Sequence, residues 1–326
     1  MTDNNSCILH ACQIEANTST DLTVEGVSAS LADENSLTWV HLDVTAEGCR
    51  DWLEREVSYL DPILINALTA DETRPRLLEM EKGVLLILRG INLNDNAEPE
   101  DMISIRLWID GSRIISLRRR RLKAVLDIRE RLSVGRGPNS SGEFVTMLTG
   151  RLFERMEQTF SDLDDRLDLL EEEVIDSPTS DKRQCIAEIR KEAILFRRYI
   201  APQKDVITHL RGCEQTWLKL IDKRRLQESL DHVTRYIEDL DVIRERAQVV
   251  KDELVNALSD RMNRNMYMLS VIAAIFMPLG FLTGLLGINV GGIPGSENGS
   301  AFYIFCGILG LIIGLQVVFF KKLKWF

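Results

Sequence analysis

The fold is decided by residues 266–320, MYMLSVIAAIFMPLGFLTGLLGINVGGIPGSENGSAFYIFCGILGLIIGLQVVFF. Two apolar segments flank a polar, glycine-rich turn at residues 287–295. Apart from Glu297, no charged residue lies between Arg264 and Lys321, so two runs of about 20 residues each can cross roughly 30 Å of hydrocarbon. The alternative is a pair of buried helices in a soluble core, but a core helix seldom reaches this length without a charge. The stretch therefore predicts a two-helix C-terminal transmembrane hairpin.

The charges beside the two segments orient this hairpin, which spans residues 265–326 with an external loop at 287–300. Arg261 and Arg264 precede the first segment and three lysines follow the second, whereas the loop contains no lysine or arginine. Cytoplasmic flanks of membrane spans carry such an excess of positive charge. Both termini are therefore predicted to face the cytoplasm.

The part of the chain before the hairpin is acidic. The chain has 40 basic and 50 acidic residues, and without the three C-terminal lysines and Glu297 there remain 37 and 49, a formal charge of −12 for residues 1–264. Such a field attracts cations and repels nucleic acid, so nucleic acid is not expected as a partner, although an acidic surface also serves solubility alone. The first residues lack the charged start and apolar run of a cleavable signal peptide.

Residues 1–143 predict a cytoplasmic α+β domain. Short apolar or alternating runs predict five strands, at Ile8–Ile14, Leu37–Val44, Val84–Leu93, Met102–Ile109 and Arg113–Leu117. Asp110-Gly111 is a turn signal between the last two strands, which predicts a hairpin. Helix-like stretches lie between and after the strands, at Ala46–Tyr59, Pro62–Ala70 and Leu122–Leu132. This pattern is typical of an antiparallel-rich sheet with helices packed on it.

Four consecutive arginines, Arg118 to Arg121, raise the alternative of a nucleic-acid patch. Such a run points to different faces of a strand or helix, no aromatic residues interleave with it, and the domain is acidic overall. We expect these arginines to form salt bridges with an acidic neighbour or subunit.

Residues 144–264 predict a helical region that consists of an antiparallel helix pair and a long pore-lining helix. Steps of three and four residues place one apolar stripe on the first helix, at Phe153, Met156, Phe160, Leu163, Leu167, Leu170 and Val174. Nine carboxylates lie between Glu157 and Asp176, with Arg166 as the one base. They form either a solvated face or an acidic fringe that gathers cations near a pore mouth. Ser177-Pro178 ends this helix, and Asp181 begins the second.

The third helix starts near Leu218 and meets no proline or glycine before Pro278. A continuous helix from Asp222 to Leu286 would be roughly 100 Å long. Its first apolar stripe is predicted at Leu226, Leu230, Val233, Ile237 and Leu240. A rod of this length cannot bury itself in one small domain, which predicts packing against the helix pair and against copies of the same chain.

Ten positions on the second half of this helix keep the four-three alternation of one face: Asp252, Asn256, Ser259, Asn263, Met266, Ser270, Ala273, Met277, Gly280 and Gly284. Small, polar and thioether groups along a central axis suit a water-filled cation path. The alternative is a close helix–helix contact, because glycines at this spacing let backbones approach. The stripe holds no His or Cys, so its chemistry favours a hydrated divalent cation and does not by itself favour Zn²⁺.

Neither span carries a charge, so proton coupling would need Asp252, other cytoplasmic carboxylates or Glu297.

Two groupings elsewhere contain the residue types that bind metal ions. Cys7 and Cys12 lie around His10, and Cys213 follows His209 by four residues, which would place both on one helix face. Each grouping has too few ligands for a closed tetrahedral site, so ordinary packing is the alternative. The cytoplasmic cysteines are expected to be reduced.

No phosphate-binding loop or nucleophile–base pair is present in the sequence, so the protein is not predicted to be an enzyme.

At Gly287-Ile288-Asn289 the chain resembles the CorA-type divalent-cation transporters, whose signature is a Gly-x-Asn turn at the outer end of the first of two C-terminal spans. The preceding span carries Phe276-Met277-Pro278 and Phe281-Leu282-Thr283-Gly284. Three segments resemble the zinc-transporter branch, ZntB: Thr73-Arg74-Pro75-Arg76, Arg197-Arg198-Tyr199-Ile200-Ala201-Pro202-Gln203 and residues 287–295. The resemblance covers most of the chain and is weakest before residue 35.

The resemblance implies a homopentamer in a bacterial inner membrane, with a funnel-shaped cytoplasmic domain and the first span lining the pore. Gly287, Ile288 and Asn289 would form the selectivity filter, with Asn289 as the outer ring that binds the hydrated cation. Ile288 departs from the Met that is common in the magnesium branch, and we expect this position to face away from the ion.

The predicted function is uptake of Zn²⁺ into the cytoplasm, with Ni²⁺ and Cd²⁺ as further candidate ions and a proton gradient as the implied driving force. No cofactor besides the transported ion is expected. One alternative is a magnesium-type channel gated by cytoplasmic ions. Another is a membrane-anchored coiled-coil scaffold that moves no ion, which would leave the polar stripe unexplained.

Overall fold

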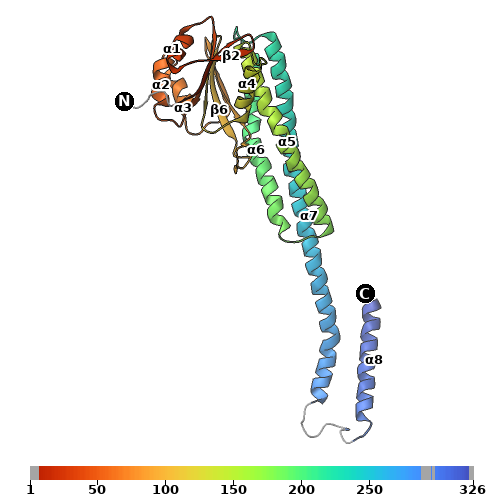
Figure 1. The fold of residues 1–326 in the computed structure, drawn as a ribbon. Coiled ribbons are helices and arrows are strands. Elements are labelled where there is room, and N and C mark those ends of the chain that lie inside the picture. The colour runs from red at the N-terminus through yellow and green to blue at the C-terminus, as the bar shows by residue number, and fades with distance from the viewer. Residues whose placement is uncertain (1–6, 288–294, 296–297, 323–326) are drawn as a thin grey trace. The chain divides into compact units, whose positions relative to one another are not determined.

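The computed structural model describes residues 7–287, 295 and 298–322. Its elements are, in chain order, β1 (Ile8–Glu15), β2 (Thr18–Asp21), α1 (Val24–Ala32), β3 (Leu37–Asp43), α2 (Cys49–Glu56), α3 (Pro62–Thr69), β4 (Arg76–Glu79), β5 (Gly83–Gly90), β6 (Ile103–Asp110), β7 (Arg113–Arg118), α4 (Lys123–Ser133), α5 (Ser141–Asp176), α6 (Lys182–Gly212), α7 (Leu220–Leu286) and α8 (Ala301–Lys322). Figure 1 shows their succession along the chain. Residue contacts divide the chain into two compact units, and the division falls within α7, after Asp252. The predicted boundary between residues 143 and 144 lies inside α5 and inside the first unit.

The first unit contains a seven-stranded sheet with the order β2-β1-β3-β7-β6-β5-β4. β3 pairs in parallel with β7, and every other neighbouring pair is antiparallel, which confirms the antiparallel-rich α+β prediction. The predicted β6–β7 hairpin is also confirmed. Its turn is held by Asp110, whose Oδ1 accepts from the backbone N–H groups of Ser112 at 3.0 Å and Arg113 at 2.8 Å.

Helices cover both faces of this sheet (Figure 1). On one face, Trp52 of α2 and Leu68 of α3 belong to a hydrophobic core with Val40 of β3. On the other face, the ring of Trp39, the residue before Val40, lies 4.9 Å from that of Phe144 in α5. Successive side chains of a strand point to opposite faces, so a central strand buried on both sides is apolar throughout and is easily predicted.

Three elements were not predicted from the sequence: α1, β2 and β4. The two strands have four residues each, are mostly exposed, and form the edges of the sheet; β2 is entirely polar, and β4 has a charged residue at each end. Edge strands are commonly short and charged, and such strands lack an apolar alternation. Their pairing partners, rather than their own composition, make them strands.

α5, α6 and the first half of α7 pack together. All seven residues of the predicted α5 stripe are buried. The ring of Phe160 in α5 lies 5.1 Å from that of Phe196 in α6 and 5.2 Å from that of Tyr236 in α7. The α7 stripe needs a correction, because Tyr236 is buried while Ile237 and Leu230 are only half-buried. The prediction of one uninterrupted third helix is confirmed, since α7 has 67 residues.

Candidate functional site

Two helices in the described part of the chain are long and apolar enough to cross a membrane, the end of α7 and α8. Within this chain only 6% of the apolar window of α7 and 0% of that of α8 is buried. A core helix of a soluble protein would be mostly covered. The low burial therefore argues against two core helices and supports the predicted membrane hairpin.

One face of α7 lies against α8 in the second unit. Buried and half-buried side chains recur along this face with the spacing of a helix, at Val271, Ala274, Ile275, Leu279 and Leu282. Gln316 of α8 reaches the same face, because its Nε2 donates a hydrogen bond to the carbonyl oxygen of Ala274 at 3.2 Å.

The predicted pore-lining stripe lies away from this contact. At 3.6 residues per turn, its positions from Met266 to Gly284 lie about 100–180° around the helix from Val271. The side chains or Cα positions of Met266, Ser270, Ala273, Met277, Gly280 and Gly284 are all exposed, as are Asp252, Asn256 and Asn263, while Ser259 is half-buried. α8 therefore leaves the stripe uncovered. The pore-lining role of the stripe stays a prediction.

The two glycines of the stripe pack against no other element in the described part of the chain. A Cβ atom added at Gly280 or Gly284 would meet no described heavy atom within 4 Å, other than the helix's own backbone. A close contact between α7 and α8 does not explain these glycines. Their small size suits either a second copy of the chain or an ion path on this side of α7.

Gly287, the first residue of the Gly-Ile-Asn turn, ends α7. Its N–H donates to the carbonyl oxygen of Thr283 at 2.8 Å, and an added Cβ would lie 2.7 Å from the same oxygen. This close approach requires glycine at the position. Ile288 and Asn289 lie outside the described residues, so their predicted roles in the filter stay predictions.

Ser270 of the stripe presents an acceptor rather than a donor. Ser270 Oγ donates to the carbonyl oxygen of Met266 at 2.9 Å. Because that bond uses its proton, the exposed hydroxyl offers only oxygen lone pairs to its surroundings. Oxygen lone pairs are the ligands that hard divalent cations and their hydration water accept.

The predicted metal pair of His209 and Cys213 gains no further ligand. His209 is exposed on α6, whereas Cys213 follows the helix and is buried. Burial, with the nearby carboxylate of Glu79, raises the pKa of the Cys213 thiol to about 12, so it stays protonated and is a poor metal ligand. Within residues 7–287, 295 and 298–322, no group of three or more His, Cys, Asp or Glu side chains is placed to hold an ion.

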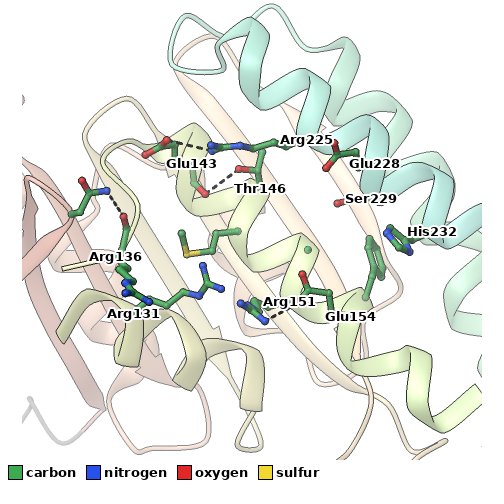
Figure 2. Close-up of a pocket in the computed structure, with 15 residues that line it drawn as sticks. Arg131, Arg136, Glu143, Thr146, Arg151, Glu154, Arg225, Glu228, Ser229 and His232 are labelled. Atoms are coloured by element: carbon green, nitrogen blue, oxygen red, sulfur yellow. Dashed lines mark hydrogen bonds and ion pairs between the residues drawn. The ribbon is translucent and has the colours of Figure 1, made fainter. Parts of the chain in front are cut away.

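A pocket of about 460 Å³ in the first unit carries mixed charge. Figure 2 shows that α5 and α7 supply most of its wall, and the segment around Arg131 and Arg136 contributes with Asn17. Two of its carboxylates are paired with arginines, Glu143 with Arg225 at 3.3 Å and Glu154 with Arg151 at 2.6 Å. Carboxylates that already hold arginines, beside further arginines, do not form a cation site.

The arginine run forms salt bridges, as predicted. Arg119 pairs with Asp71 and Arg120 with Asp101. The acidic fringe of α5 is also partly paired: Arg246 of α7 reaches Asp164 at 3.0 Å and Glu171 at 2.8 Å, and also Asp168. These contacts support a salt-bridged surface face.

Proteins named as divalent cation or zinc transporters match this chain over nearly its whole length. The family model described as CorA-like Mg²⁺ transporter protein matches residues 34–322. The Divalent cation transporter CmaX of Pseudomonas aeruginosa is 39% identical over 297 residues, which cover 90% of this chain and 89% of that protein. The Zinc transport protein ZntB of Pectobacterium carotovorum is 36% identical over 287 residues, 88% of this chain and 87% of that one. The solved structure of full-length CmaX has a TM-score of 0.85 and 33% identity, with 100% of both chains covered.

Proposed function

The chain belongs to the CorA-like Mg²⁺ transporter family, and from that membership we propose that it carries Zn²⁺ into the cytoplasm across the bacterial inner membrane. It is a membrane transporter of divalent metal cations and not an enzyme. The choice of Zn²⁺ is supported by the 36% identity to a protein named as a zinc transporter, over nearly the whole length of both chains.

The proposed pathway runs along α7 of a homopentamer. The observation that carries it is that α8 leaves the stripe from Met266 to Gly284 uncovered. Five such helices around one axis would bury these small and polar groups against a hydrated ion and expose the bulky off-stripe residues to α8 and lipid. Asn289 would then form the outer ring, just beyond the helix end at Gly287, and select the cation through its side-chain oxygen.

Uptake by the full-length protein in proteoliposomes tests the ion. We expect zinc entry without magnesium entry, because a relative named as a zinc transport protein is 36% identical over 88% of this chain and 87% of its own length. Ni²⁺ and Cd²⁺ are measured in the same way. Magnesium flux without zinc flux would favour the alternative of a magnesium-type channel, and no flux of any divalent ion would contradict transport. An imposed pH gradient tests proton coupling, which would be rejected if the uptake rate ignored its direction.

Asn289→Ala tests the filter. We expect it to abolish uptake and to leave the size of the oligomer unchanged, because the residue acts on the ion and not on the helix contacts. Asn265→Ala is the matched control, since Asn265 is an exposed asparagine of α7 that lies off the stripe. Equal uptake by Asn289→Ala and the control would remove Asn289 from the pathway.

A further inference from the structure

Pro278 interrupts the hydrogen bonding of α7 inside the first span. Proline has no backbone N–H, so the carbonyl oxygen of Ala274, four residues earlier, loses its helical donor. In the hydrocarbon of a membrane no water replaces that donor, and an unsatisfied carbonyl there is strongly unfavourable. The proline site therefore needs a donor from elsewhere in the protein.

Gln316 of α8 supplies that donor. Its Nε2 donates to the carbonyl oxygen of Ala274 at 3.2 Å, the same oxygen that Pro278 leaves free. Gln316 is also an exception in its own sequence, because residues 307–320 are otherwise apolar or glycine. A polar side chain inside a span is costly, and its cost is offset here by one specific backbone bond.

The geometry points to a positioning role: we propose that Gln316 replaces the hydrogen-bond donor that Pro278 removes and thereby fixes the second span behind the pore stripe. The inference that this affects transport rests on the proposed function, since only then does α7 line the pathway. The coupling between Gln316 and Pro278 stands on the two helices alone.

The bond lies where α7 is most easily deformed. Helices bend at proline, where one rung of the hydrogen-bond ladder is missing. Gly280 and Gly284 follow, and neither is packed against a described neighbour. Val271, about two turns before Pro278, is a buried side chain on the face of α7 that lies against α8. Gln316 therefore holds α7 from the α8 side at the point where the helix itself is weakest, and this contact sets the direction in which Ala273 and Met277 face.

The orientation of the amide follows from the same contact. A backbone carbonyl can only accept, so the nitrogen of the Gln316 amide must face Ala274. The other amide atom, Oε1, is buried and has no partner among the described residues. The side chain thus makes one hydrogen bond and leaves one buried acceptor without a partner among the described residues. A leucine at this position would leave no such unsatisfied acceptor. Its presence is explained by what the bond does for α7.

A double-mutant cycle on the full-length protein tests the proposal. We expect Gln316→Leu to shift the unfolding equilibrium, measured by titration with SDS in mixed micelles, by about three- to eighteenfold, which spans the average and the largest effect found for hydrogen bonds between membrane helices. In the Pro278→Ala background the backbone N–H returns and satisfies Ala274, so Gln316→Leu should have no such effect there. Equal effects of Gln316→Leu in both backgrounds would overturn the proposal.

Further measurements separate this proposal from the proposed function. Cation uptake in proteoliposomes should slow in Gln316→Leu and recover part of its rate in the double variant. Val317→Leu, a change at the exposed neighbouring position of α8, should alter neither stability nor uptake. If Gln316→Leu alone does not accumulate, rescue of its accumulation by Pro278→Ala supports the proposal and failure of that rescue contradicts it. The unfolding cycle needs no transported ion, so it gives its answer even if no ion is carried.

Discussion

The two halves of α7 differ in what surrounds them. Before Asp252, a regular stripe that includes Leu226, Val233, Tyr236 and Leu240 is buried. After Asp252, Leu254 and Val271 are the buried residues of the same helix. The first half is explained by packing within one chain, whereas the second half, which is apolar from Met266 onward, is covered by described residues mainly on the face that lies against α8. In the proposed pentamer, lipid, neighbouring copies and the ion would surround the side chains that this chain leaves uncovered in the second half.

The largest effect on stability is expected in the first half. Phe160→Ala removes a ring that touches Phe196 and Tyr236 at the meeting of three helices. The substitution should lower the free energy of unfolding by about 3–5 kcal/mol, because it leaves a cavity in a close-packed core. Thermal unfolding of the full-length protein followed by circular dichroism measures the change.

Met277→Ala is the matched change in the second half. Met277 is 72% exposed within the chain, so its truncation leaves no internal cavity there. We expect little change in unfolding and a change in cation uptake, the reverse of the Phe160→Ala result. Similar losses of stability in the two variants would contradict the contrast between the halves.

A smaller effect is expected from Arg246, which joins the first half of α7 to α5 through Asp164, Asp168 and Glu171. Its side chain is 35% exposed, and exposed ion pairs contribute about 0.2–1 kcal/mol each. Arg246→Ala should therefore destabilise the fold modestly, and the loss should shrink at high salt because salt screens surface charges. Unfolding at two ionic strengths measures it. Arg224→Ala, at an exposed arginine of α7 with no ion pair in the described part of the chain, should show neither effect.

Patterns with a single dominant cause were predictable from the sequence. The charge-free runs predict the hairpin, the steps of three and four predict the buried stripe of α5, and Asp110-Gly111 predicts the β6–β7 turn. Each depends on residues close together in the chain. The stripe of α7 was placed one residue off at Tyr236, because three helices decide which of two neighbouring apolar residues turns inward.

Features that depend on two distant segments were not predictable. The bond between Gln316 and Ala274 requires the register of the two spans, which neither segment specifies alone. A signal was nevertheless present, since a proline in one span and a lone amide in the other each break the local pattern. The sequence also could not predict that the stripe and α8 lie on different sides of α7, because small residues alone fit a helix contact equally well.

Cysteine accessibility along α7 tests most directly the claim that the uncovered stripe lines the cation path. Single cysteines at Ala273 and Met277 on the stripe, and at Ile275 and Leu279 on the α8 face, are introduced into the full-length protein with its native cysteines replaced. A hydrophilic, positively charged thiol reagent is then applied during uptake in proteoliposomes. We predict that the two stripe variants react and lose cation uptake, while the two α8-face variants keep it. If the stripe cysteines are protected and uptake is instead blocked at Ile275 and Leu279, the stripe does not line the cation path.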